Sequence, residues 1–463
     1  MLDPNIQHQE PYSLSTQSCE AAKSQVKLHV MRNSYEPPAA DCDSSDDEDL
    51  MNVFFLHVFQ HHTAKKKSGN RQRYKRRRRP RWIHRRLRWA EHLRKLHHEQ
   101  AFDRTYRMSY TAFCKLLDLL RDDLMTASAG KRGGYHDTDI VEPDLIMAIG
   151  IRWLAGGSYV DIRHVYGCSV ASVFRFRDMF IDAVLNCKDL DIVFPDTDED
   201  VASTASKFAS KSSERILVGC VGAIDGLFVK ICCPSMKACG NNPQAYFSGH
   251  YMAHGLNIQA ICDSDHRFTF FGVIAPGKCS DQVAFERTSI HCRIMELPTG
   301  MYLVGDAAYQ ISEVVLVPFT GSQRDDPGKD AFNFFLSQLR IRIEMAFGLL
   351  QTKWSVLKKP LQVNLHTAAR TIEACARLHN FCLREDTTVD PNHDEAILNE
   401  IVPQSKTPIA GWGYLPTLEE LQPIPGTSIV RDVIIDRIGQ LGLQRPTHNL
   451  LANRRELHEI GLM

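Results

Sequence analysis

The chain has 463 residues, of which 43% are hydrophobic and 24% charged, and its 55 basic side chains balance 55 acidic ones. This apolar share is enough to bury a core, which excludes a wholly disordered chain. The longest uninterrupted apolar run is Ile216–Ile224, about half of what a membrane-spanning helix needs, so we expect no membrane segment. No basic start followed by an apolar stretch opens the chain, and its 14 Cys form no CxxC pair. We therefore expect no secretory signal and a reducing compartment.

Residues 1–64 are polar and contain an acidic block, residues 41–49, in which six of nine side chains are acidic. This composition predicts a disordered, acidic N-terminal region. A short apolar patch, VFFLHVF at residues 53–59, interrupts it. We expect this patch to dock either on the chain's own core or on a partner.

A basic segment, residues 65–100, follows. Sixteen Lys and Arg fall between Lys65 and Lys95, and Glu91 is the one acid among them. Like charges at this density favour a polyanionic partner, and DNA fits because neutralised phosphates release counterions. A nuclear-import sequence is the alternative, and both interpretations place the protein in the nucleus. The candidate DNA-contacting side chains are Arg76, Arg77, Arg78 and Arg79.

Residues 101–185 have the apolar spacing of helices. Trp89 comes just before them, and it either stacks on bases of a nucleic acid or starts the packed region. Within it, Ser158 and Ser169 can each cap a short helix, and Gly167 can form the turn between them. This pattern is typical of a helix-turn-helix domain whose second helix presents Arg175 and Arg177 to DNA. A helical hairpin that binds nothing is the alternative.

Residues 186–215, which include a polar stretch at 196–213, are predicted to be a linker. Beyond it the chain becomes rich in strands. The expected elements are strands at 217–231, 256–262, 267–275, 301–305 and 314–318, and helices at 281–295 and 331–357. Their order predicts an α/β fold with a ribonuclease H-like core at residues 216–385. Residues 386–463 are expected to form a polar tail with one helix near 429–443.

Three carboxylates stand beside apolar sequence. Asp225 follows ILVGCVGAI, Asp306 follows MYLVG, and Glu344 lies in the helical pattern LRIRIEMAFGLL. Buried acids are unfavourable unless they are paired or bind a metal, and hard oxygen ligands suit Mg²⁺ or Mn²⁺. The alternative is that the two Asp cap loops and that Glu344 pairs with Arg340 or Arg342. The residues expected to face the core beside Glu344 are Ile341, Met345, Gly348 and Leu349.

Six sequence blocks between about residues 140 and 385 together resemble PIF/Harbinger-type DDE transposases and their derived nucleases. The blocks are AIDG, PGKCSD, GDAAY, FNFFLSQLR, RIRIEMAFG and ARLHNFC. The resemblance implies that Asp225, Asp306 and Glu344 bind catalytic divalent metals and that Asp281 has a supporting role. It also implies a separate Myb-like DNA-binding partner protein.

The chain departs from that family at two places. Leu227-Phe228 stand where the family often has Thr-His, and Ala307-Ala308 stand where it often has Ser-Gly. Neither change removes a proposed metal ligand, but both alter the residues around one. We therefore keep three hypotheses: a metal-dependent DNA endonuclease or transposase, a domesticated DNA- or chromatin-binding protein that no longer cuts, and an assembly module. A homo-oligomer is compatible with all three.

Overall fold

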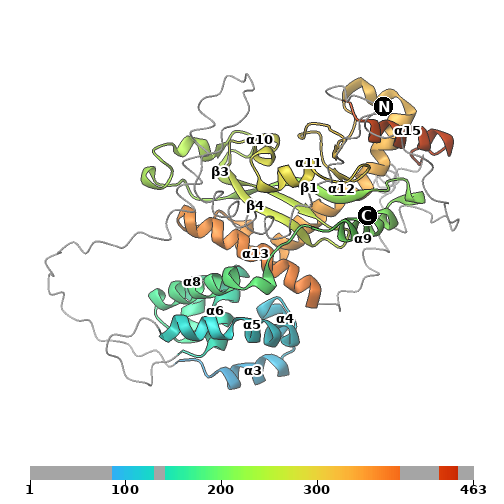
Figure 1. Cartoon of the computed structure of the whole chain (residues 1–463). Helices are drawn as coiled ribbons and strands as arrows, with labels where there is room; N and C mark the ends of the chain where they lie inside the picture. The colour runs from blue at the N-terminus through green and yellow to red at the C-terminus, as the bar shows by residue number, and fades with distance from the viewer. Residues whose placement is uncertain (1–85, 130–140, 386–426, 447–463) are drawn as a thin grey trace, which may run out of the picture. The chain divides into compact units, whose positions relative to one another are not determined.

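The computed structural model describes residues 86–129, 141–385 and 427–446 (Figure 1). The acidic and apolar parts of residues 1–64 lie outside these ranges, as do Arg76, Arg77, Arg78 and Arg79. The predictions made for them therefore stay predictions. No helix in the described ranges is both long and apolar enough to cross a bilayer.

In the described residues, the six α-helices from residue 89 to residue 186 pack around an aromatic cluster. Trp89 stacks on Phe113 with ring centroids 5.6 Å apart and meets the edge of Tyr106 at 5.8 Å, so it belongs to the packed region. Burial of such rings is a large part of the stability of a helical unit. The helices are α3 (Trp89–His98), α4 (Phe102–Tyr106), α5 (Tyr110–Ala129), α6 (Pro143–Leu154), α7 (Tyr159–Tyr166) and α8 (Val170–Asn186).

The turn between α7 and α8 has the capping chemistry that the sequence indicates. Ser158 Oγ accepts a hydrogen bond from Val160 N at 3.2 Å, and Ser169 Oγ accepts one from Ser172 N at 3.1 Å. Gly167 ends α7 with φ +60°, a conformation that glycine adopts without steric cost.

The predicted linker contains a helix instead, α9 (Asp198–Lys211). Thr197 caps its start, and one side of the helix buries Val201, Ala205 and Phe208. The prediction was wrong because the apolar side chains of this helix are few and spaced among many polar ones.

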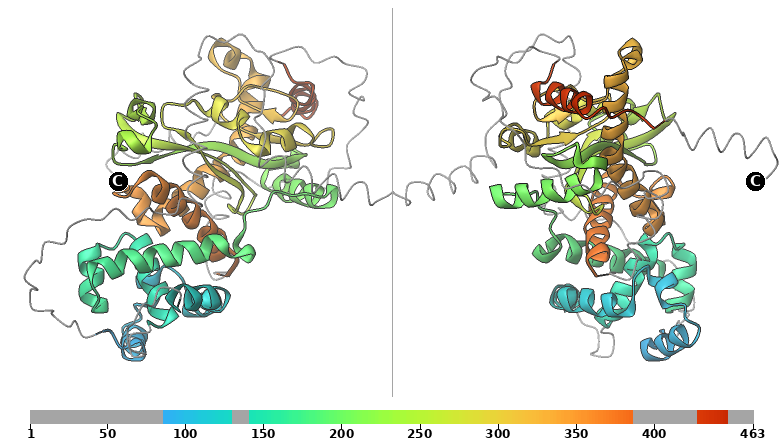
Figure 2. Two further views of the ribbon diagram at one scale, coloured as in Figure 1. Left: turned by 60° about the vertical axis from the view of Figure 1, so that its left-hand side comes forward. Right: turned by 90° about the vertical axis from the view of Figure 1, so that its right-hand side faces the viewer.

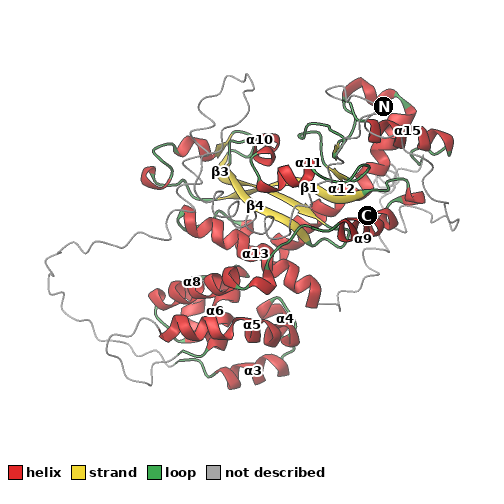
Figure 3. Cartoon of the chain, in the orientation of Figure 1, coloured by secondary structure: helices red, strands yellow, loops and turns green. Residues whose placement is uncertain are grey.

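A mixed sheet forms the centre of the second half of the described chain (Figure 3). The strand order is β4–β3–β1–β5–β6, in which the first three strands are antiparallel and the last three are parallel. Strand β2 pairs antiparallel with the start of β3. The strands are β1 (Cys220–Lys230), β2 (Phe247–Ser248), β3 (Ala253–Cys262), β4 (Phe268–Pro276), β5 (Tyr302–Val304) and β6 (Val315–Leu316).

Helices lie on both sides of this sheet (Figure 2). The expected single helix at 281–295 is two helices. Thr288 ends the helical stretch and caps the second helix, where its side chain accepts a hydrogen bond from His291 N. The helices after β4 are α10 (Asp281–Glu286), α11 (Ser289–Met295), α12 (Pro327–Lys353), α13 (Leu365–Glu385) and α15 (Ile429–Gln440). Short 3₁₀ turns are η3 (Lys188–Leu190), η4 (Ser213–Arg215), η5 (Met236–Ala238), η6 (Pro243–Tyr246), η7 (Gly321–Asp325) and η8 (Ser355–Lys358).

Strand β3 shows how the two faces of the sheet differ. Leu256, Ile258 and Ala260 join the core shared with α12 and α13, whereas Ile261 joins a second core with α11. Successive strand residues point to opposite faces, so Asn257 and Gln259 share the face of Ile261. This alternation decides which face each polar side chain of the site reaches.

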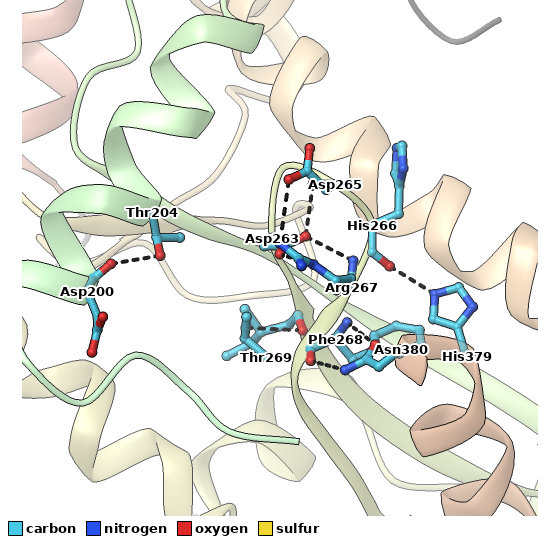
Figure 4. Close-up of polar contacts among 11 residues, drawn as sticks. Asp200, Thr204, Asp263, Asp265, His266, Arg267, Phe268, Thr269, His379 and Asn380 are labelled. Carbon is cyan, nitrogen blue, oxygen red and sulfur yellow. Dashed lines mark hydrogen bonds and ion pairs between the residues drawn. The ribbon is translucent and has the colours of Figure 1, made fainter. Parts of the chain in front are cut away.

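Helix α13 holds the hairpin between β3 and β4 (Figure 4). Asn380 forms two hydrogen bonds with the backbone of Phe268: its Oδ1 accepts from Phe268 N at 2.8 Å and its Nδ2 donates to Phe268 O at 2.7 Å. His379 Nε2 lies 2.9 Å from the carbonyl oxygen of His266. The block ARLHNFC therefore has a structural role here, and His379 is a core histidine.

Helix α15 packs on the folded part of the chain. Glu313 accepts hydrogen bonds from Ile429 N at 2.8 Å and from Val430 N at 3.1 Å, which satisfies free backbone donors at the start of the helix. Ile434 and Ile438 are fully buried. The expected polar tail thus includes a helix that contributes to the core.

Candidate active site

The sheet places Asp225 and Asp306 side by side. In the parallel pair of β1 and β5, Ala223 is opposite Val304. Asp225 is two residues beyond Ala223 and Asp306 is two residues beyond Val304, so the register that pairs the strands also aligns the two carboxylates. Each is held by a local hydrogen bond: Asp225 Oδ1 accepts from Gly226 N at 2.8 Å, and Asp306 Oδ1 accepts from Ala308 N at 2.9 Å.

Electrostatics make this pair unusual. The pKa of Asp225 is raised to about 7, chiefly by burial and further by the charges of Asp306 and Asp281, against the opposing effects of the Gly226 N–H and the Arg340 guanidinium. A carboxylate that resists ionisation beside other carboxylates is typical of sites where a cation or a proton completes the charge balance.

Helix α12 presents Glu344 differently from what the sequence predicts. Ile341 and Leu349 are each 41% exposed, and the buried side of the helix is formed by Arg342, Ile343, Ala346, Phe347 and Leu350. The expected inward face was therefore wrong, since Ile341 and Leu349 are exposed while Arg342 is buried.

Glu344 consequently lies at the surface of α12, where its side chain is 46% exposed and forms an ion pair with Arg340 one turn earlier. The charge of Arg340 also acts on Asp225. The positive charge of Arg340 thus interacts with both Glu344 and Asp225. The structure does not bring Glu344 directly to the aspartate pair.

The donor chemistry of this site fits a hard divalent cation, because Asp225 and Asp306 offer carboxylate oxygens, and burial together with the neighbouring carboxylates disfavours the charged state of Asp225. In the described residues, however, no three His, Cys, Asp or Glu side chains approach closely enough to form a metal site. The aspartate pair fits two ligands of a cation. A third protein ligand would require Glu344 to exchange Arg340 for the cation.

The two candidate DNA-contacting arginines of α8 have different environments. Arg175 is exposed. Arg177 is 6% exposed, its guanidinium lies 4.8 Å from the ring centroid of Trp153, and it forms an ion pair with Asp178 at 2.6 Å. Arg177 therefore acts in packing, which corrects its expected placement at a DNA-facing surface, and of the two Arg175 is the one free to reach a phosphate.

Sequence reasoning missed the polar residues behind the aspartate pair. Gln259 is fully buried and Tyr309 is 4% exposed. Gln259 donates a hydrogen bond to Asp281, and Tyr309 donates one to Gln259. A pattern pointed to Gln259 but not to Tyr309: in LNIQAIC, Asn257 and Gln259 are polar residues two apart within a strand that is otherwise apolar. Such spacing places two amides on one face of a buried sheet.

Comparison with known proteins gives one match. Residues 224–380 match the family model of the DDE superfamily endonucleases, and this range contains Asp225, Asp281, Asp306 and Glu344. No curated protein matches significantly, and no solved structure does. The match suggests a transposase-like nuclease domain in this region, and the mixed α/β fold and the alignment of the two aspartates are compatible with that class.

Proposed function

We propose that the protein is a metal-dependent DNA endonuclease of the Harbinger type, acting in the nucleus on phosphodiester bonds. The observation that carries the proposal is the match of residues 224–380 to the DDE endonuclease family, with Asp225 and Asp306 aligned across neighbouring strands inside it. The strand order β4–β3–β1–β5–β6 supports a ribonuclease H-like core, since it has three antiparallel strands followed by two parallel ones.

In this proposal Asp225 and Asp306 bind Mg²⁺ or Mn²⁺, and Glu344 joins them once it leaves Arg340. Bound divalent cations would supply the charge that activates an attacking water and stabilises the leaving 3′-oxygen. Arg340 is then free to pair with a phosphate of the DNA, because a guanidinium can exchange one oxyanion for another. Strand transfer by the freed 3′-hydroxyl, a Myb-like partner and self-association are further parts of the Harbinger-type proposal.

The DNA-contacting surface proposed for this enzyme combines the basic segment, with Arg76, Arg77, Arg78 and Arg79, and the exposed Arg175 at the start of α8. Charge supports both, since each arginine that neutralises a phosphate adds to affinity without reading sequence. These contacts would hold DNA while the carboxylates act on it.

The test is nicking of supercoiled plasmid by the full chain in Mg²⁺. Asp306→Ala should reduce the nicking rate at least about a hundredfold, because it removes a ligand worth several kcal/mol in the transition state, and DNA binding should persist. Asp325→Ala changes an exposed aspartate of η7 and should nick at the wild-type rate.

Equal nicking by Asp306→Ala and the wild type would refute the assignment. DNA binding by a wild-type chain that never nicks would instead favour a domesticated DNA-binding protein. The Arg340–Glu344 ion pair is the feature that would explain such a loss.

A further inference from the structure

A chain of hydrogen bonds runs behind Asp225, on the opposite face of the sheet. Asn257 Nδ2 donates to Asp281 Oδ1 at 2.8 Å, and Gln259 Nε2 donates to the same oxygen at 2.9 Å. Gln259 Nε2 also donates to Asn257 Oδ1 at 2.8 Å. Because two amides from β3 share one carboxylate oxygen, Asp281 is fixed at the first position of α10.

The same chain continues to the turn that carries Asp306. Tyr309 Oη donates to Gln259 Oε1 at 2.7 Å. A second connection lies beside it, where Gln310 N donates to Gln282 Oε1 at 2.7 Å. The turn that begins at Asp306 is thus tied at two points, to β3 and to the start of α10.

Asp281 also supports β1 directly. Gly226 is paired with Gln259 across the two strands, and a Cβ added at Gly226 would lie 2.1 Å from Asp281 Oδ1. The Asp281 carboxylate therefore occupies the side-chain position of Gly226, next to Asp225. Since neighbouring strand residues point to opposite faces, Asp281 supports the backbone that carries Asp225 from behind.

We propose that Gln259, Asp281 and Tyr309 form a positioning network that fixes Asp225 and Asp306 relative to each other, so that the two carboxylates can bind one divalent cation. Asp281 takes part as a support of the backbone and not as a ligand. This inference rests on the proposed function, because the cation is the one that the endonuclease requires.

The chemistry of Gln259 explains why Tyr309 matters. The Gln259 amide has one acceptor end and one donor end. Donation by the Tyr309 hydroxyl to Oε1 fixes the orientation of the amide, and this orientation turns Nε2 toward Asp281. Without the hydroxyl the amide can flip, which would place its oxygen against the carboxylate and push Asp281 and the strand beside it apart.

Calorimetric titration of the full chain with Mn²⁺ tests this network. Tyr309→Phe should weaken Mn²⁺ binding ten- to hundredfold, the usual effect of removing a group that orients a metal ligand, while the melting temperature changes little. Gln259→Glu should weaken it further, because a second carboxylate then faces Asp281. Asp306→Ala, which removes a proposed ligand, should abolish binding.

Tyr302→Phe is the matched control. Tyr302 is a fully buried tyrosine of the neighbouring strand β5, and its hydroxyl has no hydrogen-bond partner within the described part of the chain. Its loss should leave Mn²⁺ affinity unchanged.

Three results would overturn the inference. If Tyr309→Phe binds Mn²⁺ like the wild type while Asp306→Ala does not, the network has no positioning role and the proposed nuclease site stands. If the Mn²⁺ affinity of Tyr309→Phe falls only as far as a drop in its melting temperature accounts for, the network merely stabilises the fold. A wild-type chain that binds no Mn²⁺ would overturn both the network and the metal-dependent function.

Discussion

Gly226 is the residue at which the two faces of the candidate site meet. It follows Asp225 in β1, and its missing side chain leaves the space that the Asp281 carboxylate fills. The requirement for glycine here comes from close approach and not from an unusual backbone conformation. Asp225 and Asp281 can therefore approach the same peptide unit from opposite sides.

At this scale we predict that Gly226→Ala lowers the free energy of unfolding by about 1–3 kcal/mol, the cost of overpacking a filled space. In an Asp281→Ala background the same change should cost much less, because the oxygen that it meets is gone. Chemical denaturation of the four variants of this double-mutant cycle measures the coupling.

Gly348→Ala is the control for Gly226→Ala. An added Cβ at this position of α12 has no atom within 4 Å, so the variant should be as stable as the wild type or slightly more stable, since alanine favours a helix. Additive effects of Gly226→Ala and Asp281→Ala would contradict the close contact.

At the scale of elements, the buried His379 connects helix α13 to the β3–β4 hairpin. Burial lowers the pKa of His379 to about 4, although its hydrogen bond with the His266 carbonyl oxygen favours the charged form. A lowered pKa means that the neutral form stabilises the fold. This contribution is complete above the ordinary histidine pKa of about 6.5 and is lost as the pH falls toward 4.

We therefore predict that His379→Gln makes the free energy of unfolding less dependent on pH between 6.5 and 4. Glutamine can still donate to the His266 carbonyl oxygen but does not become charged. Denaturation curves at a series of pH values compare the variant with the wild type. His254→Gln, at a partly exposed histidine of β3, is the control, and equal slopes for His379→Gln and the wild type would contradict the prediction.

Elements defined by continuous apolar sequence were predictable, and elements defined by weak or mixed patterns were not. Strand β1 follows from the apolar run before Asp225, and α7 and α8 follow from Ser158 and Ser169 with Gly167 between them. Helix α9 was missed because its buried side chains are sparse. The break at Thr288 was missed because a capping threonine and an ordinary helical threonine look alike in sequence.

The candidate site was predictable in part for the same physical reason. Both aspartates follow apolar strand sequence, and strand register then aligns them, although Asp225 lies within β1 and only Asp306 lies beyond the end of its strand. The position of Glu344 depends on which side of α12 is buried, and the buried Arg342 and the exposed Ile341 reverse the usual relation between polarity and burial. The hydrogen bonds of Gln259 with Asp281 and Tyr309 depend on tertiary contacts that no local pattern encodes.

At the scale of the whole molecule, the helices before the sheet and the sheet itself are joined through α13. Arg377 Nη1 donates to Leu185 O, at the end of α8, at 3.3 Å, and Lys115 of α5 pairs with Glu385 at 2.6 Å. If Arg175 of α8 holds DNA as proposed, these contacts of α13 connect the bound DNA to the sheet.

We predict that replacing Arg76, Arg77, Arg78 and Arg79 together by Gln weakens DNA binding and makes its salt dependence shallower. If all four contact phosphates, the slope of log affinity against log salt should change by up to about 3.6, because each contact contributes about 0.9. Fluorescence anisotropy with a labelled duplex at several salt concentrations measures the slope.

The import alternative predicts another result for the same variant. A tagged protein would then leave the nucleus while its slope in vitro stays that of the wild type. Arg324→Gln, at an exposed arginine of η7, should change neither the slope nor the location. A variant with four Gln that keeps both the wild-type slope and its nuclear location would contradict both roles of this segment.

Successive side chains of β1 point to opposite faces of the sheet, and this alternation limits where residues can be inserted or deleted in the protein. Asp225 and Gly226 are adjacent, yet one contributes to the aspartate pair and the other receives the support of Asp281 from behind. One inserted or deleted residue in β1 before Asp225 would exchange the two faces and turn the carboxylate toward α10. Insertions and deletions in related sequences should therefore accumulate between β1 and β3, at residues 232–246, and be absent from the strand itself.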